Sequence, residues 1–483
     1  MTMYQAFSDL IDAVSGYMYS YILIVLLLAV GLWFTLRSKF VQLRLLPESI
    51  RVVSEKPKGE NAVSAFQALM VSTASRVGTG NIVGVASAIA AGGYGAVFWM
   101  WVIALVGGAS AFVESTLAQI YKKRDPEGGS YGGPSYYIQA ALKSRVLGVL
   151  FAAALIATYA GGFNMLCSFN LISSFSSYGF YAAAGTVVLG GREFSVAAAA
   201  GGGVLALLVA VCIFGGGKRI VKVTGVLVPV MGVLYIVMAI LVMALNIGAL
   251  PGVLARIFRE AFDFRAVFGG FAGSAVMEGV KRGLYSNEAG IGSAPNAAAA
   301  ADVSHPVKQG LVQMLSVFID TLLICTATAM MTLCTGVDIK GGLTGAPLVQ
   351  ASLATVFGSF GPYFITLALL LFAFTTLLGN LFYCEGCMNY IAGRKVGPAG
   401  RMVFDLAAVA LVFVGALLEV GLVWNIADVL MGVMALINLP VIVLLGGKAI
   451  RALEDYLEQR RDGKDPVFKA ASIGLREETD FWR

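Results

Sequence analysis

The sequence predicts an all-α, polytopic membrane protein with eleven transmembrane helices: one extra N-terminal helix and two five-helix repeats of opposite orientation. Three observations lead to this prediction. Only 13% of the 483 residues are charged, about half the share in soluble domains. The apolar residues gather in eleven stretches that are long enough to cross a bilayer. Glycines interrupt two of these stretches, in comparable places of the two halves, which is typical of inverted-repeat transporters.

The first apolar stretch, residues 17–36, is expected to be a retained membrane helix rather than a cleavable signal. The residues before it include Asp9 and Asp12 but no lysine or arginine, and Arg37 and Lys39 follow it. A signal peptide has the opposite charge pattern. We therefore expect an extracellular N-terminus, with residues 1–60 forming the extra helix and a basic cytoplasmic linker.

Ten further apolar stretches divide evenly between two repeats, residues 61–249 and residues 250–447. Because five is an odd number, the two repeats must have opposite orientations in the membrane. The expected spans are 62–91, 96–121, 146–178, 196–214, 223–249, 266–283, 307–336, 359–391, 402–418 and 422–446.

The placement of basic residues predicts the orientation of the chain. Alternate connections between spans, together with the tail at 448–483, contain 28 of the 34 lysines and arginines. Basic residues favour cytoplasmic loops. We expect a multi-pass protein of the cell membrane with a cytoplasmic tail, and we expect that tail to be a short interfacial helix followed by a flexible end.

The first glycine-rich interruption contains Gly78, Thr79, Gly80 and Asn81. Irregular backbone at membrane depth is tolerated only where protein or a water-filled cavity satisfies it. The free N–H groups after such a break suit a carboxylate, and the carbonyls before it suit a cation. We expect the first three residues to bind a substrate carboxylate, and Asn81 to contact the amino group or an ion. The alternative is that the glycines only allow close helix packing.

The second interruption is expected at residues 268–275, FGGFAGSA, where the backbone would face the amino end of the substrate. Its proposed contributors are Gly269, Gly270, Gly273 and Ser274. A shift of 206 positions also aligns Arg76 and Asn81 with Arg282 and Asn287. That match would pair the first interruption with a basic segment beyond the seventh span, so we interpret it as a coincidence of small residues.

Four motifs resemble the alanine or glycine:cation symporter family. They are SRVGTGNI at 75–82, GAVFWMW at 95–101, GGPSYY at 132–137 and SNEAGIGSA at 286–294. The resemblance covers roughly residues 15–450. It implies a LeuT-type core preceded by one extra helix, and sodium-driven uptake of small neutral amino acids such as alanine or glycine.

The resemblance also implies a Na⁺ site between the first broken helix and the ninth span. By position its ligands would be the carbonyls of Ala74 and Val77 and the hydroxyls of Thr375 and Thr376. Oxygen ligands suit a hard cation. The hydroxyls could instead bond back to their own helix, which is common in apolar helices.

Two positions depart from the family pattern, and both bear on substrate choice. Many members have a glutamine three residues after Asn164, where this chain has Cys167, and many have a tryptophan where Asn380 stands. Loss of a large indole leaves a roomier, more polar pocket. Serine or glutamine thus remains an alternative substrate, and proton coupling an alternative to Na⁺.

Other classes of function fit the sequence less well. An intramembrane enzyme needs a cluster of catalytic side chains, but the single histidine lies at a predicted helix boundary. A channel or sensor would show a symmetric pore-lining ring rather than two asymmetric breaks. We expect no enzyme activity, no organic cofactor and no nucleic-acid partner. Among the carboxylates within spans, Asp320 is nearest the middle and is the candidate for coupling.

Overall fold

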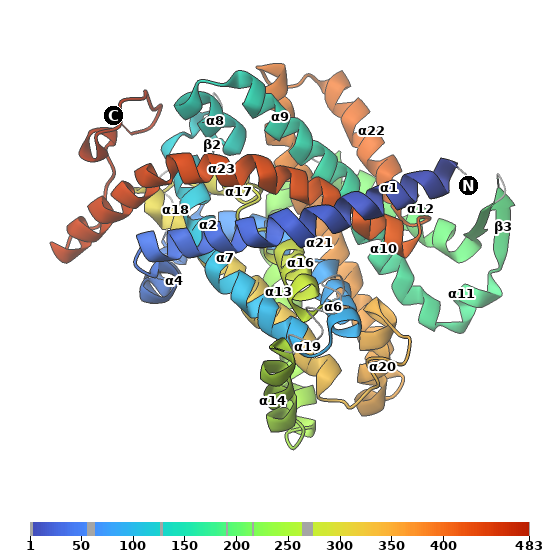
Figure 1. The fold of residues 1–483 in the computed structure, drawn as a ribbon. Coiled ribbons are helices and arrows are strands. Elements are labelled where there is room, and N and C mark those ends of the chain that lie inside the picture. Colours follow the sequence, from blue (N-terminus) through green and yellow to red (C-terminus); the bar gives the residue numbers. More distant parts are fainter. Residues whose placement is uncertain are drawn as a thin grey trace.

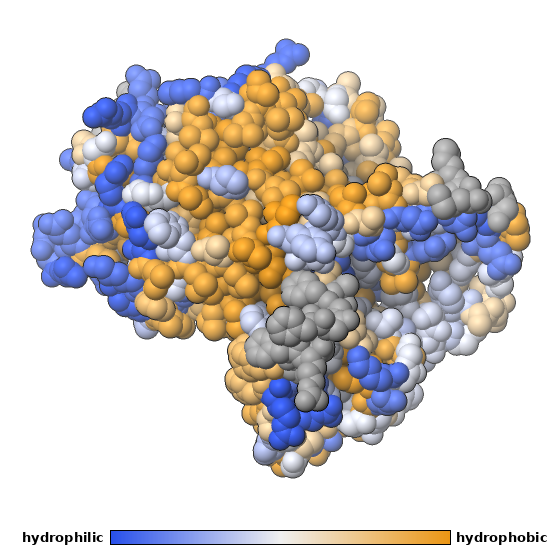
Figure 2. Space-filling view, in the orientation of Figure 1, coloured by the Kyte–Doolittle hydropathy of each residue, from blue (hydrophilic) through white to orange (hydrophobic). Residues whose placement is uncertain are grey.

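The computed structural model describes residues 3–55, 63–125, 129–189, 192–214, 217–262 and 274–482. Helices dominate, and the strands of this part form two antiparallel hairpins, β1 (Lys123–Arg124) with β2 (Ser130–Tyr131) and β3 (Thr186–Leu189) with β4 (Arg192–Ser195). Within these ranges, nine helices are long and apolar enough to cross a membrane. Figure 2 shows a wide hydrophobic surface with hydrophilic residues gathered at its margins. Both findings agree with the predicted polytopic helical membrane protein.

The chain begins with one long helix that precedes the first broken helix. It consists of α1 (Met3–Tyr17), the π-helical turn η1 (Met18–Leu23) and α2 (Ile24–Arg37). Its buried residues Leu23, Leu27, Val30 and Phe34 recur at helical spacing, so one face packs on the bundle. In Figure 1 the helix runs alongside α23 (Val420–Arg461). The short α3 (Val41–Arg44) and α4 (Leu46–Val53) follow.

The part of the chain predicted to be the first repeat begins with a helix in two pieces. Ser64 caps α5 (Ala65–Arg76) in a capping box with Gln67, and the chain resumes as η2 (Thr79–Asn81) and α6 (Val83–Gly92). The remaining elements are α7 (Gly95–Ile120), α8 (Pro134–Leu142), α9 (Arg145–Ile156), the π-helical turn η3 (Ala157–Phe163), α10 (Asn164–Ser173), η4 (Ser174–Ser177), α11 (Gly179–Ala183), α12 (Val196–Ile213) and α13 (Gly217–Leu245).

The part of the chain predicted to be the second repeat contains two helical pieces separated by a short interruption, α16 (Ala275–Asn287) and α17 (Pro295–Ala300). Its other elements are α14 (Leu250–Ala261), α18 (Pro306–Val317), the π-helical turn η5 (Phe318–Cys325), α19 (Thr326–Leu333), α20 (Gly345–Phe357), α21 (Phe360–Ala392) and α22 (Pro398–Gly415). Single π-helical turns within α-helices are frequent at functional sites, and η3 and η5 both adjoin the site described below.

The described residues contain an interruption that was not predicted, while most of the predicted one lies outside them. Gly269, Gly270 and Gly273 lie outside the described residues, and Ser274 instead caps α16 by accepting a hydrogen bond from the Met277 amide at 3.2 Å. The interruption within the described residues lies between Asn287 and Pro295. The expected span over 266–283 was therefore wrong, since the helix continues beyond its predicted end.

Two buried cations explain why hydropathy placed the end of this span too early. Lys281 and Arg282 resemble a basic loop, but both are buried and contact the carboxylate of Asp428 on α23, at 2.9 Å and 3.2 Å. Buried charges are tolerated when they are paired. These two residues therefore do not belong to a solvent-exposed connection, and the count of basic loop residues that includes them was too high.

Helices α7 and α16, which come from different repeats, are in very close contact. A Cβ atom on Gly279 would lie 2.4 Å from the Ala96 carbonyl oxygen, and one on Gly283 would lie 2.5 Å from Cγ2 of Ile103. Glycines at such contacts let two backbones approach closely. The second helix of the first repeat is thus packed tightly against the broken helix of the second.

The tail is folded, so the prediction of a flexible end was wrong. Residues 465–482, including η6 (Ala470–Ile473), return to the end of the bundle, and Phe468 and Trp482 are buried. The Trp482 indole donates a hydrogen bond to the Gln119 carbonyl at 2.8 Å, and Lys123 pairs with Asp480 at 2.8 Å. Two aromatic anchors within a charged run hold this segment in place.

The start of α18 faces the same tail. Nδ1 of His305 accepts a hydrogen bond from the Val307 amide at 3.2 Å, and Nε2 lies 3.0 Å from Oδ2 of Asp455. Burial holds the pKa of His305 below its ordinary value. Because Nδ1 accepts from the Val307 amide, the Nε2 proton faces Asp455, and the ring caps the start of α18.

Replacing Trp482 should release the tail without unfolding the bundle. Trp482→Ala removes the indole that fills the contact with Phe468 and Gln119, a loss of about 3 kcal/mol for a buried tryptophan. We expect faster limited proteolysis of the tail in the purified protein. Trp33→Ala is the matched control because that indole is exposed. Equal cleavage rates in wild type and Trp482→Ala would contradict the described docking.

Candidate functional site

The first break is held open by one of its own side chains. The helix α5 ends at Arg76, Val77 leaves the helical conformation, Gly78 is extended, and η2 follows. Oδ1 of Asn81 accepts a hydrogen bond from the Gly78 amide at 2.8 Å. Asn81 therefore stabilises the turn, in addition to any contact with a ligand.

Glycine is required at two positions of this break because side chains from other helices approach its backbone. A Cβ atom on Gly80 would lie 2.2 Å from Cε1 of Tyr285, and one on Gly78 would lie 2.4 Å from Oγ1 of Thr376. Neither distance is possible for a real side chain. The break is thus enclosed by a tyrosine of α16 on one side and a threonine of α21 on the other.

The second break contains Glu288, which has a buried carboxylate and a strained backbone conformation. Glu288 has a left-handed backbone conformation, with φ at 53°, and its side chain is buried. Gly290 and Gly292 follow with φ at 86° and 88°. A non-glycine residue in this region costs free energy, and such residues cluster at functional sites. These backbone conformations indicate that the interruption is a defined part of the fold and not a frayed helix end.

The two breaks lie against each other. Nδ2 of Asn81 donates to Oγ of Ser286 at 3.0 Å, and Oγ of Ser75 lies 3.5 Å from Oε1 of Glu288. The alignment shifted by 206 positions pairs Asn81 of the first break with Asn287, the last residue of α16 before the second break. That shift was the signal in the sequence that could have located the second break.

Asp320 joins both breaks from the π-helical turn η5. Its carboxylate accepts hydrogen bonds from Asn81 Nδ2 at 2.7 Å, Ser286 Oγ at 2.6 Å and Thr321 Oγ1 at 2.8 Å. The side chain is fully buried, and an ionised carboxylate in such a place needs several donors. Thr328 completes the cluster by donating to the Asn81 carbonyl at 2.7 Å.

The predicted Na⁺ ligands are only partly brought together. Oγ1 of Thr376 donates to the Ala74 carbonyl at 3.0 Å, and it also lies close to Gly78, next to Val77. The Thr375 hydroxyl instead bonds back to the carbonyls of Leu371 and Phe372 at 3.0 Å and 3.1 Å. The oxygens of Ala74 and Thr376 suit a hard cation, whereas Thr375 points away from the break.

The residues predicted to contact the substrate side chain form a buried polar chain. Asn380 on α21 donates to Asn164 Oδ1 at 2.8 Å and accepts from Ser75 Oγ at 2.7 Å. Cys167 on α10 lies 3.5 Å from the Ala373 carbonyl. Both asparagines thus contact one another beside the first break. The sequence did not single out Asn170, which donates to the Thr79 hydroxyl at 3.0 Å.

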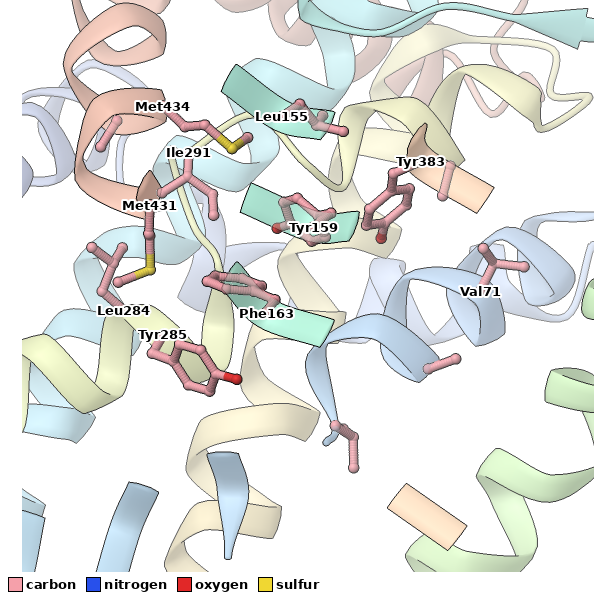
Figure 3. Close-up of a cluster of buried hydrophobic side chains, with 14 of the residues drawn as sticks. Val71, Leu155, Tyr159, Phe163, Leu284, Tyr285, Ile291, Tyr383, Met431 and Met434 are labelled. Atoms are coloured by element: carbon pink, nitrogen blue, oxygen red, sulfur yellow. The ribbon is translucent and has the colours of Figure 1, made fainter. Parts of the chain in front are cut away.

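Aromatic rings form a wall beside the breaks, as Figure 3 shows for Tyr159, Phe163 and Tyr285. The ring centroid of Phe163 lies 4.9 Å from that of Tyr159 and 4.8 Å from that of Tyr285. Trp424 on α23 continues the row at 5.1 Å from Tyr285. Such rings supply a large apolar surface, and sequence reasoning missed all of them because no local pattern marks them.

Comparison with known proteins agrees with this architecture. The amino-acid carrier protein AlsT of Bacillus subtilis (strain 168) is 45% identical over 99% of this chain and 98% of its own length. The probable sodium/glutamine symporter GlnT of the same organism is 44% identical over 96% of this chain and 94% of its own length. The sodium/alanine symporter AgcS of Methanococcus maripaludis is 38% identical, covering 94% and 98%.

A solved structure shows the same fold at low sequence identity. The crystal structure of MhsT in complex with L-phenylalanine superimposes with a TM-score of 0.52 at 16% identity, covering 88% of this chain and 94% of MhsT. This likeness establishes a LeuT-type fold. The family model described as the sodium:alanine symporter family matches residues 4–470. The chain belongs to the sodium:alanine symporter family.

Proposed function

We propose that this protein is a secondary active symporter that uses the Na⁺ gradient to import small neutral amino acids by alternating access. The observation that carries this proposal is the contact between two helix breaks through Asn81, Ser286 and Asp320. Facing breaks expose backbone donors and acceptors at one buried place. The names of AlsT and AgcS support an alanine-type substrate.

The substrate carboxylate is assigned to the first break. Thr79 and Gly80 lie at the start of η2, where N–H groups of the first helical turn favour a negative group. Gly78 precedes them, and its own amide already donates to Oδ1 of Asn81. The hydroxyl of Thr79 is oriented by Asn170. The amino group is assigned to the second break, where Glu288 offers a carboxylate and Ser286 and Asn287 offer carbonyls.

Two places near the breaks suit a cation. One has the carbonyls of Ala74 and Val77 and the hydroxyl of Thr376, and the other has the carboxylate of Asp320 with the hydroxyl of Ser286. Na⁺ prefers such oxygen ligands, as hard cations do. A cation at Asp320 would neutralise a buried charge, which lowers the cost of closing the site around the substrate.

The membrane arrangement follows from the same helices. Nine apolar helices in the described ranges, together with the broken pairs α5–α6 and α16–α17, give the eleven spans that we propose. The tail and the basic residues near it are assigned to the cytoplasm, and the N-terminus to the outside. The start of α5 is then on the cytoplasmic side, where inward opening would begin.

Uptake into proteoliposomes tests the function. We expect labelled L-alanine to accumulate when an inward Na⁺ gradient is imposed, and not when K⁺ replaces Na⁺. Accumulation that ignores Na⁺ and follows a pH gradient would overturn the cation assignment. Competition by glycine, serine and glutamine then ranks the substrates. The polar pair Asn164 and Asn380, and the relative GlnT, make glutamine the second candidate.

Neighbouring threonines offer a matched test of the first cation place. Thr376→Ala removes the hydroxyl that contacts the Ala74 carbonyl, and we expect the Na⁺ concentration for half-maximal uptake to rise about tenfold. Thr375→Ala removes a hydroxyl that bonds only within α21 and to Met231, so it should change this value little. An equal effect of both substitutions would count against the assignment.

A further inference from the structure

Three buried polar side chains of α5 and α18 have almost no hydrogen-bond partners in the described part of the chain. Arg76 donates from Nη1 to the Gln313 carbonyl at 3.2 Å, but its Nε and Nη2 bond to nothing in the described part of the chain. Both amide atoms of Gln309 and of Gln313 are likewise unpartnered there. Arg76 is 2% exposed, and the glutamines are fully buried. Leaving such groups unpaired is costly, so each requires an explanation.

These side chains lie between the two breaks and a cavity at the other end of the same two helices. Ala65 and Lys308, at the starts of α5 and α18, line a cavity of about 250 Å³. Thr73 and Ser316 are in contact at 3.2 Å further along, and Asn81 meets Asp320 at the far end. The two helices therefore run side by side in one direction. Gln313 and Gln309 lie one turn apart on α18, on the way from the breaks to the cavity.

The free atoms of Arg76 are those that bind a carboxylate best. Nε–H and one Nη2–H form one edge of the guanidinium and can make two parallel hydrogen bonds to a single carboxylate. The oxygen of a glutamine amide can accept from an ammonium group, and its nitrogen can donate to a carboxylate. The three residues together thus offer partners for both ends of an amino acid.

The surrounding charges favour a zwitterion over a simple anion. Three buried carboxyl groups lie around the breaks next to Arg76: Glu288 contacts the neighbouring Ser75 at 3.5 Å, Asp320 contacts Asn81 at 2.7 Å, and Glu114 accepts from the Gly290 amide at 3.2 Å. None of them forms an ion pair with Arg76 in the described part of the chain. A simple anion beside Arg76 would be repelled by three buried carboxylates. An amino acid carries its own positive charge, which offsets that repulsion.

We propose that Arg76, Gln309 and Gln313 form a second, inner amino-acid site, which the substrate occupies on its way from the breaks to the cavity. The inference rests on the proposed function. In the described conformation α5 and α18 are in contact, so the site forms when α5 moves away from α18. The unpartnered atoms lower the cost of that movement, because separation hydrates them.

Counterflow measures directly how strongly the inward-facing transporter binds L-alanine. Proteoliposomes with equal Na⁺ on both sides are loaded with increasing unlabelled L-alanine, and entry of labelled L-alanine is followed. For Arg76→Gln we expect the internal alanine concentration for half-maximal counterflow to rise about tenfold. Arg76→Lys should have a smaller effect because a lysine keeps the charge without the two-point edge. Gln313→Leu should raise the same value.

Two further measurements separate the inner site from the breaks. Na⁺-dependent binding of L-alanine from outside, and the Na⁺ concentration for half-maximal uptake, should stay near wild-type values in Gln313→Leu, which changes no charge. Arg259→Gln, which removes an exposed arginine of α14, is the control and should leave all three values unchanged.

Other results would overturn the inner site. If Arg76→Gln shifts the Na⁺ dependence and leaves the internal alanine dependence at the wild-type value, Arg76 is only a counter-charge to the buried carboxylates. If Arg76→Gln does not fold, an unchanged internal dependence in Gln313→Leu is enough to reject the proposal. Failure of the proposed function is a different result, in which the wild type shows no Na⁺-dependent uptake.

Discussion

Substitution of Gly80 by alanine should abolish Na⁺-dependent uptake of L-alanine. The added Cβ would meet Cε1 of Tyr285 at 2.2 Å, so either the break or the tyrosine of α16 must move. A displacement of this size at a binding site reduces activity by about a hundredfold. The measurement is the initial rate of uptake in proteoliposomes, normalised to the amount of folded protein by size-exclusion chromatography.

The control for this substitution is Gly161→Ala. Gly161 lies in the π-helical turn η3, and a Cβ atom there would meet nothing within 4 Å. It tests the cost of losing a glycine in a membrane helix near the site without a steric clash. Wild-type uptake by Gly80→Ala would show that the substrate does not use this break.

Replacement of Asp320 by asparagine should weaken coupling to Na⁺ more than any change at Thr376. Three donors point at the carboxylate, and the asparagine amide would bring a further donor among them. Loss of such charge-assisted bonds costs about 3 kcal/mol, which corresponds to about a hundredfold in affinity. We expect half-maximal uptake to need about a hundredfold more Na⁺.

Asp338→Asn provides the matched control for the charge change. Asp338 is exposed in the connection between α19 and α20 and bonds only to the Lys340 amide and within its own loop. Its substitution should leave the Na⁺ dependence unchanged. An Asp320→Asn protein with the Na⁺ dependence of the wild type would remove Asp320 from the cation site, while leaving the assignment at Thr376 open to its own test.

The first break could be predicted from the sequence because its cause is local. Gly78, Gly80 and Asn81 lie within four residues of one another, and no other part of the chain is needed to see that they disfavour a helix. The apolar stretches of the other spans are equally local. Length and composition therefore gave most of the helical architecture.

The second break could not be located in this way because it depends on distant partners. Lys281 and Arg282 can be buried because they form ion pairs with Asp428, which is about 150 residues away in the sequence. No pattern in the local sequence predicts such a pair. The same limit applies to the threonines of α21. Whether Thr375 or Thr376 faces the first break depends on the rotation of the helix, which packing against α5 and α13 decides.

The close contacts at glycines between α7 and α16 predict that these two helices move together as one rigid body. Gly279 and Gly283 leave no room for sliding, since backbone and side-chain atoms of α7 already lie where a Cβ would stand. This prediction can be tested by a spectroscopic distance measurement. The distance between a probe on α7 and a probe on α16 should stay constant through the transport cycle, and it can serve as the fixed reference against which movement of α5 is measured.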